Sequence, residues 1–334
     1  MTGILRKQID LRPSTHNTYC ASWHQDWTIG STFHGGCVVA IIHHAAETHL
    51  RNQPKPNQPD ILNLHVEFLR ACERCDSTIA VNPLKTGAIA STFQVELRQK
   101  GELKALALAT STNFDRPLGP TVPTAWTPLP PPPPKPDFAR VLRHEPDPEW
   151  VPAIYSGEVI PFTGRILVLD PRAGNPVDGI CDAWNGFANP EERIDSTTLA
   201  FLTDLIPSMS DTLLRNGGLY DAHAFQEKAK RWANANPGVP APLTNSLAEA
   251  MKAKTLNQTV TLDVEFKRRL PAAGLRFVFM RTSTKMLRDG RMDADLVVLD
   301  EDMGIVCTSR QVLLVLEAGR KFKKDKGSST STKL

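Results

Sequence analysis

The sequence predicts an α+β protein in which one unit, a long helix followed by an antiparallel sheet, occurs twice. Three observations lead to this prediction: two strand-like segments are alike at a constant separation, an apolar helical stretch precedes each, and further strand-like segments follow each. With 334 residues and 41% hydrophobic content, the chain is long enough to form one large core or two of ordinary size. Duplication of one unit is the simplest account of this order.

The first helix is predicted at FHGGCVVAIIHHAAETHL, which begins at Phe33 and opens on two glycines. Its apolar residues Val38, Ile41, Ile42 and Ala45 follow helical spacing. Glycine is a poor helix former, so the pair needs a reason. Either it lets a ligand carbonyl approach the unpaired N–H groups of the helix start, or it allows close packing of the helix.

The repeated strands are LHVEFLR at residues 64–70 and LDVEFKR at residues 262–268, in which Leu, Val and Phe alternate with polar residues as in a half-buried strand. Lead-in strands are predicted within 17–27 and 156–170. Antiparallel strands should follow the repeats at 78–84, 87–99 and 102–110 in the first half and at 275–283, 290–301 and 305–317 in the second.

A proline-rich segment separates the halves, because Phe114 to Ala153 holds 13 of the 27 prolines, including Pro130–Pro134. Such a segment favours extended polyproline structure and serves as a semi-rigid connector, with a ligand for a proline-binding domain as the alternative. The expected domains are therefore 1–128, a linker at 129–153, and 154–318. A tail at 319–334 should be disordered.

The second helix is predicted in DSTTLAFLTDLIPSMSDTLL, where Leu199, Leu202, Ile206, Met209 and Leu213 form one apolar stripe and Asp204 lies off that face. Residues 217–255 form an insertion that contains three prolines. It is predicted to fold as two short amphipathic helices around a proline turn, which would act as a lid or shape a tunnel.

The charge balance gives no support for nucleic-acid binding. The net charge is +3, and RKFKKDK at 320–326 alone supplies more than that excess. The CERC stretch (Cys72, Cys75) lacks the second ligand pair of a zinc site, so reduced thiols are expected, with no metal and no cofactor.

No signal peptide and no membrane span are predicted. The chain ends Thr332-Lys333-Leu334, close to a Ser-Lys-Leu peroxisomal signal but with Thr in its first position. A cytoplasmic location is therefore expected, with the peroxisome as the alternative.

A long helix lying across an antiparallel sheet, once per half, resembles the hotdog fold, and its duplication resembles the double-hotdog acyl-CoA thioesterases of the TesB type. The Phe33–Gly36 start is similar to the first central helix of that family. The segments LAFLTDL, MRTST and CTSRQV resemble the family segments that provide a catalytic Asp, Thr and Gln, respectively. The resemblance thus implies catalytic roles for Asp204, Thr282 and Gln311, with His34, Gly35 and Gly36 at the oxyanion.

This constellation suits hydrolysis of an acyl thioester, either an acyl-CoA or a carrier-bound acyl or polyketide chain. A carboxylate takes a proton from the attacking water, while a hydroxyl and an amide hold that water. Glu47 lies far from the glycines along the first helix, so one active site per chain is expected. A homo-oligomer of double hotdogs is possible.

Two alternatives remain open at this point. One is a non-catalytic acyl-binding hotdog module. The other is a biosynthetic hotdog enzyme, such as a dehydratase, a cyclase or a product-release enzyme, although Asp26 and His34 are a poor match to a dehydratase pair.

Overall fold

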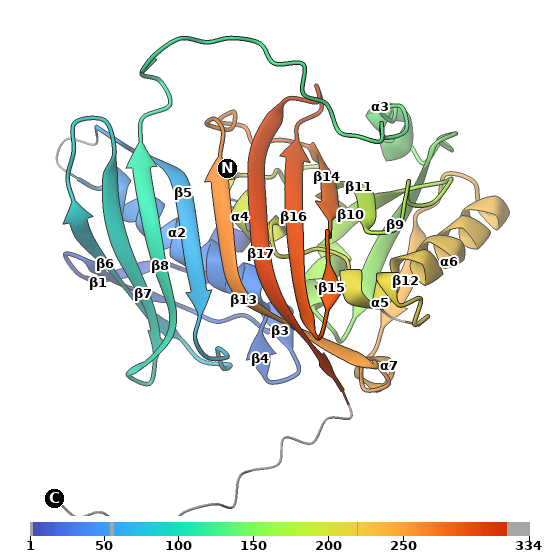
Figure 1. Ribbon diagram of the computed structural model, residues 1–334, viewed down its shortest axis with the longest axis horizontal. Coiled ribbons are helices and arrows are strands. Elements are labelled where there is room, and N and C mark those ends of the chain that lie inside the picture. Colours follow the sequence, from blue (N-terminus) through green and yellow to red (C-terminus); the bar gives the residue numbers. More distant parts are fainter. Residues whose placement is uncertain (1–2, 54–56, 219, 319–334) are drawn as a thin grey trace, which may run out of the picture.

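The structure is a computed structural model that describes residues 3–53, 57–218 and 220–318 (Figure 1). Within these residues, fifteen strands form one continuous sheet, which is antiparallel except where β12 (Ala241–Asn245) joins β9 (Trp150–Gly157) at one edge. A separate hairpin of β3 (Thr28–Ile29) and β4 (Thr32–Phe33) precedes the first long helix.

The first half contributes one edge of the sheet and the longest helix, α2 (Gly35–Arg51), which lies behind its strands in Figure 1. Helix α1 (Ile4–Ile9) and the 3₁₀ turn η1 (Gln25–Trp27) precede α2. The strands, in spatial order, are β1 (Arg12–Thr15), β2 (Thr18–Ala21), β6 (Ser77–Lys85), β7 (Ser91–Gln99), β8 (Glu102–Thr112) and β5 (Asp60–Phe68).

The second half continues the sheet from β5 with the same arrangement. Its strands, in spatial order, are β13 (Thr255–Phe266), β17 (Ile305–Glu317), β16 (Arg291–Leu299), β14 (Phe277–Ser283), β11 (Ile180–Phe187), β10 (Ile166–Pro171), β9 and β12, with β15 (Leu287–Arg288) on β16. The predicted meander after each repeat is confirmed in both halves.

The two repeated segments pair with each other. Strand β5 runs antiparallel to β13 with His65 opposite Asp263, Leu64 opposite Val264 and Val66 opposite Leu262. His65 and Asp263, which are equivalent positions of the repeat, therefore lie opposite each other at a local two-fold axis, and their side chains meet there at 2.7 Å. This pairing confirms that two duplicated units join edge to edge, which also removes two exposed strand edges.

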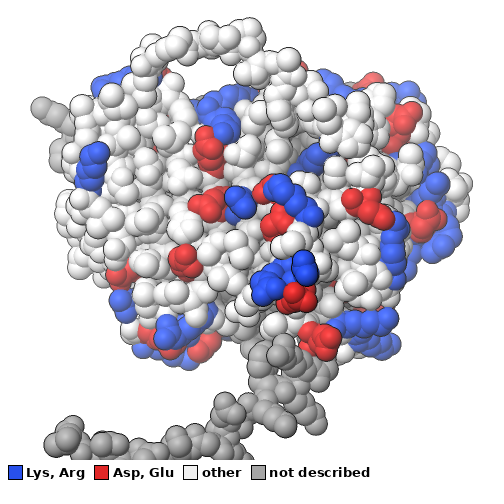
Figure 2. All heavy atoms as spheres, in the orientation of Figure 1, with Lys and Arg blue, Asp and Glu red and all other residues white. Residues whose placement is uncertain are grey.

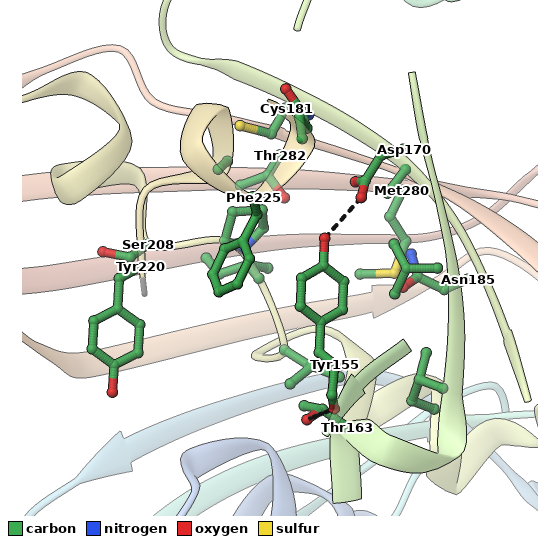
Figure 3. Close-up of a pocket in the computed structure, with 18 of the residues that line it drawn as sticks. Tyr155, Thr163, Asp170, Cys181, Asn185, Ser208, Tyr220, Phe225, Met280 and Thr282 are labelled. Atoms are coloured by element: carbon green, nitrogen blue, oxygen red, sulfur yellow. Dashed lines mark hydrogen bonds between the residues drawn. The ribbon is translucent and has the colours of Figure 1, made fainter. Parts of the chain in front are cut away.

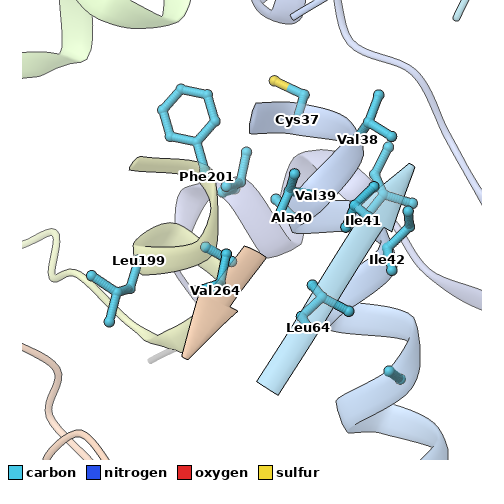
Figure 4. Close-up of a cluster of buried hydrophobic side chains, with 14 of the residues drawn as sticks. Cys37, Val38, Val39, Ala40, Ile41, Ile42, Leu64, Leu199, Phe201 and Val264 are labelled. Atoms are coloured by element: carbon cyan, nitrogen blue, oxygen red, sulfur yellow. The ribbon is translucent and has the colours of Figure 1, made fainter. Parts of the chain in front are cut away.

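One hydrophobic core runs through both halves (Figure 4). Helix α2 is apolar almost all round because it lies between the sheet and α4 (Ser196–Leu202), so both of its faces are buried. In this core α2 contributes Val39 and Ile41, the repeated strands contribute Leu64 and Val264, and α4 contributes Phe201. Each such buried aliphatic or aromatic side chain stabilises the fold by roughly 1.5–3 kcal/mol.

The proline-rich connector arches from β8 to α3 (Phe138–Leu142) over one end of the sheet in Figure 1. It is held by hydrogen bonds to its carbonyls, from Trp150 Nε1 to Pro134 O and from Arg281 Nη1 to Pro130 O, both 2.7 Å. Helix α3 and the first residues of β9, from Trp150, lie inside the predicted linker 129–153, so regular structure resumes earlier than expected.

The insertion differs from its prediction of two helices. It contains α6 (Ala222–Ala235), then strand β12 and the single turn α7 (Leu247–Ala250). Pro240 and Pro242 cannot donate helical hydrogen bonds, and proline is tolerated in a strand only at an edge such as this one. A 3₁₀ turn, η2 (Pro161–Arg165), follows β9.

Lys, Arg, Asp and Glu are interspersed over the face shown in Figure 2, without a large area of one sign. In the part of the chain that the structure describes, no helix is long and apolar enough to cross a membrane, and no cluster of three or more His, Cys, Asp and Glu side chains could hold a metal. The predicted disordered tail 319–334, with its final Thr332-Lys333-Leu334, lies outside the described residues.

Candidate active site

Asp204 lies in a turn between two short helices. The predicted continuous helix through Met209 and Leu213 is wrong, because α4 ends at Leu202 and α5 (Met209–Leu213) starts anew after Ser208. Pro207 causes the break, since it has no N–H to donate and it disfavours helical geometry at the residue before it. Asp204 is consequently not on a helix face but in the turn, where it is 9% exposed.

The break at Pro207 also leaves a backbone acceptor free. In a continuous helix the carbonyl of Thr203 would accept from the N–H of residue 207. Here it accepts instead from Gln311 Nε2 at 2.8 Å, and Gln311 is buried on β17. The helix break therefore fixes the Gln311 amide beside Asp204, and the structure brings these two predicted residues together.

Thr259 completes this group, although the sequence did not single it out. Its hydroxyl lies 3.3 Å from Asp204 Oδ1 and 3.5 Å from Gln311 Oε1. Side chains of a regular strand alternate between its two faces, so Thr259, three residues before the buried Leu262, would lie on the outer face of β13. A bulge between Thr259 and Thr261 shifts this alternation by one residue and turns Thr259 inward, opposite Leu313.

The start of α2 faces the same carboxylate. His34 caps the helix, and its Nδ1 accepts the N–H of Gly36 at 3.1 Å. In the described residues the N–H of Gly35 has no hydrogen-bond partner, and Gly35 is only partly buried. A free N–H at a helix start beside a buried carboxylate is a place where a developing negative charge on a carbonyl oxygen would be stabilised.

Both glycines are required by close contacts. A Cβ on Gly35 would lie 2.6 Å from Asp204 Oδ2, and a Cβ on Gly36 would lie 2.5 Å from the carbonyl oxygen of Phe201 in α4. Gly36 thus serves helix packing, while Gly35 makes room for the carboxylate. The packing explanation for the glycine pair is therefore supported at Gly36, while the approach of a ligand carbonyl stays a prediction.

Burial controls the charge state of this site. It raises the pKa of Asp204, and the neighbouring His34, the Thr259 hydroxyl and the Gly36 N–H partly oppose the rise. Burial lowers the pKa of His34, against the attraction of Asp204 at 3.7 Å. A neutral imidazole agrees with its Nδ1 accepting from Gly36 and leaves the carboxylate without a charged partner at His34.

Thr282 lies elsewhere in the second half. It is on β14, opposite Cys181 and Leu296, and it is 2% exposed. Within the described residues it forms no side-chain hydrogen bond to Asp204 or Gln311; Thr259 does so in its place. Thr282 instead lines a cavity of about 200 Å³ on the inner face of the sheet (Figure 3).

That cavity adjoins the segment that follows Asp204, because Leu205, Ile206 and Pro207 form part of its wall, although Asp204 itself does not line it. Strands β9, β10, β11 and β14 provide another wall, and the insertion contributes Tyr220 and Phe225. The insertion therefore forms part of the wall of this cavity.

The first half has no matching polar group. Position 259 corresponds to Ile61 in the repeat, where β5 has an equivalent bulge, and Gln311 corresponds to Ala109, which pairs with Leu64 as Gln311 pairs with Leu262. Ile61 and Ala109 are buried and apolar. The groups around Asp204 therefore occur once in the described residues.

The start of α4 is the counterpart of the start of α2, and here Arg6 from α1 occupies the place beside the helix. It donates to Asp195 at 2.7 Å, to Glu47 at 2.6 Å and to Ser196 at 3.0 Å. Burial alone would raise the pKa of Glu47, but its neighbours His43, Arg6 and Arg51 lower it to about 2. This end of the molecule is closed by a buried charge network.

Comparison with known proteins agrees with this architecture. Models of the acyl-CoA thioesterase N-terminal and C-terminal domains match residues 23–112 and 128–315. The thioesterase-like protein TwmA of Talaromyces wortmannii is 26% identical over 338 residues, covering 95% of this chain and 93% of that protein.

Two solved structures share the fold over nearly their whole length. A hotdog-fold protein of unknown function from Alicyclobacillus acidocaldarius has a TM-score of 0.67 at 17% identity, covering 95% of this chain and 99% of its own. The acyl-CoA thioesterase II TesB2 of Mycobacterium marinum has a TM-score of 0.60 at 15% identity, covering 94% and 98%. The fold is a tandem hotdog, and the two matched domains show that the chain belongs to the acyl-CoA thioesterase family of thioester hydrolases.

Proposed function

We propose that the chain hydrolyses an acyl thioester, an acyl-CoA or a carrier-bound acyl chain, with a water molecule that Asp204 activates. The observation that carries the proposal is the buried Asp204 carboxylate, which lies beside Gln311, Thr259 and the free N–H of Gly35. Burial raises the pKa of Asp204, which makes its carboxylate a stronger base than an exposed one.

The neighbouring groups have complementary roles in this proposal. The Gln311 amide is fixed by Thr203, so its Oε1 can accept from the attacking water. The Thr259 hydroxyl, which lies within reach of both Asp204 and Gln311, orients the carboxylate or the water. The Gly35 N–H stabilises the oxyanion that forms when the thioester carbonyl is attacked.

The reaction balances without a cofactor. The water oxygen bonds to the carbonyl carbon, Asp204 takes one water proton, and the tetrahedral intermediate expels the thiolate. Asp204 then gives this proton to the thiolate, so the products are a carboxylic acid and a free thiol, and the Asp204 carboxylate is regenerated.

The test is thiol release from acyl-CoAs of graded length by the wild type and by Asp204→Asn. We expect the variant to keep its melting temperature and to lose on the order of 10² or more in kcat. Asp178→Asn is a matched control, because Asp178 is exposed and bonds only the surface Arg215 in the described residues. Undiminished hydrolysis by folded Asp204→Asn would exclude Asp204 as the base.

A further inference from the structure

The cavity beside Asp204 is mainly apolar but contains a buried carboxylate. Val159, Ile166, Val168 and Met280 line it, as expected for a hydrocarbon chain. Asp170, at the end of β10, also lines it and is only 7% exposed. An acidic residue in such a wall needs an explanation, since apolar side chains would fill the space at lower cost.

Asp170 is poorly compensated for a buried charge. Its Oδ2 accepts from the Tyr155 hydroxyl at 2.7 Å (Figure 3), and no other side-chain hydrogen bond or ion pair of Asp170 forms in the described part of the chain. Burial raises the pKa of Asp170 to about 6, although the Tyr155 hydrogen bond opposes the rise. The fold does not require this carboxylate, because the β10 backbone pairs with Val151 whatever the side chain.

A second polar group of the cavity is also incompletely bonded. Gln226, from α6 of the insertion, is 8% exposed and lines the same cavity. Its Nε2 donates to Asn175 at 2.9 Å, while its Oε1 has no partner among the described residues. Buried polar groups are nearly always paired, so Gln226 is a second incompletely compensated polar residue in the wall of this cavity.

We propose that this cavity binds an acyl chain that carries a hydroxyl group, which donates a hydrogen bond to Asp170. The inference rests on the proposed function for the placement of the thioester at Asp204. An unsubstituted chain would remove water from the carboxylate without replacing its hydrogen bonds, whereas a hydroxyl replaces one of them. A site built to hydrogen-bond a substrate hydroxyl discriminates strongly against the analogue that lacks it.

The proposal is tested first by binding alone, with S-alkyl-CoA thioethers that cannot be hydrolysed. Pairs of equal length, with and without a terminal hydroxyl, are titrated calorimetrically over a graded series of lengths. For the wild type we expect the hydroxylated member to bind about tenfold more tightly at the length that reaches Asp170. A ratio near one at every length would overturn the proposal.

Two variants locate the effect. Asp170→Leu should bring the ratio to about one while plain chains bind as well as before or better. Asp170→Asn has the same shape and can still accept from Tyr155, but it presents an NH₂ group, so it should favour a chain with a terminal oxo group over the hydroxylated one. Melting temperatures check that both fold, and the exposed Asp178→Asn serves as the control. A preference for the hydroxylated over the plain chain that survives in folded Asp170→Leu contradicts the proposal, as does an unchanged preference for the hydroxyl over the oxo group in folded Asp170→Asn.

Thiol release from the corresponding thioesters is measured separately. Loss of hydroxyl selectivity with hydrolysis intact refutes only the cavity assignment. Selective binding without hydrolysis refutes only the proposed reaction, so the two failures are distinguishable.

Discussion

The Gln311 amide donates to the carbonyl of Thr203 at 2.8 Å, in the position that the N–H of residue 207 would occupy in an unbroken helix. The helix break thereby serves the site twice, since it places Asp204 in a turn and leaves an acceptor that orients Gln311. A proline that lowers the regularity of the helix is thus part of the arrangement around the carboxylate.

Replacing this proline should separate activity from stability. In Pro207→Ala the new N–H competes with Gln311 for the Thr203 carbonyl, so we expect kcat to fall roughly tenfold, the size of one lost hydrogen bond. The melting temperature should be unchanged or higher, because the helix can extend. Pro120→Ala in the exposed connector is the control. An unaltered kcat would show that the Thr203 bond is not needed to orient Gln311.

Two threonines can be compared with the same isosteric change. Thr259→Val should lower kcat by about 10–10²-fold, because it removes a hydroxyl that lies against a carboxylate. Thr282→Val should chiefly change KM and the preferred acyl length, because Thr282 lines the cavity. Steady-state kinetics with several acyl-CoAs distinguish them. The reverse pattern would favour the water-holding role that the sequence motif MRTST implies for Thr282.

The sequence was informative where local pattern and register coincide. The repeat at residues 64–70 and 262–268 predicts both the duplication and the strands that join the halves. Gln311 was named through the resemblance of CTSRQV to a family segment, and in the structure it lies buried on a regular strand. In these segments the local pattern and the tertiary structure agree.

Thr259 could not be found in the same way. A bulge adds one residue to the strand and thereby exchanges the inward-facing and outward-facing positions. The segment VTLDVEF contains no glycine or proline that would have indicated the bulge. The matching bulge in β5, between Ile61 and Asn63, likewise could not be recognised from the sequence. The signal for the α4 break was present in Pro207, but the apolar stripe on either side of it suggested one helix.

The glycine pair should show different effects at its two positions. Gly35→Ala places a Cβ 2.6 Å from Asp204 Oδ2, so the carboxylate must turn away. We expect at least a tenfold loss of kcat with a small change in melting temperature, because a side chain yields more easily than backbone. Thiol-release assays and thermal unfolding of the same preparations check this.

Gly36→Ala is the comparison for that experiment. Its Cβ would lie 2.5 Å from a backbone carbonyl of α4, which cannot rotate away. The free energy of unfolding should fall by about 1–3 kcal/mol, as for an overpacked core. If Gly36→Ala proved as stable as the wild type and Gly35→Ala unfolded, the assignment of packing and site roles would be reversed.

The Arg6–Glu47 network predicts a pH-dependent contribution to stability. Although burial alone would raise it, the folded-state pKa of Glu47 is held at about 2, below the ordinary value of 4.5, by His43, by the Arg6 guanidinium at 2.6 Å and by Arg51. A depressed pKa stabilises the fold above the unfolded-state pKa, and this stabilisation is lost as the pH falls through the folded-state pKa.

Urea unfolding at several pH values should therefore show that the free energy of unfolding of the wild type exceeds that of Glu47→Gln by about 3 kcal/mol near neutral pH. The difference should shrink between pH 4.5 and 2. Glu227→Gln, on the exposed side of α6, is the control and should show no such trend. If the difference in free energy of unfolding between wild type and Glu47→Gln stayed constant down to low pH, Glu47 would contribute through packing rather than through its charge.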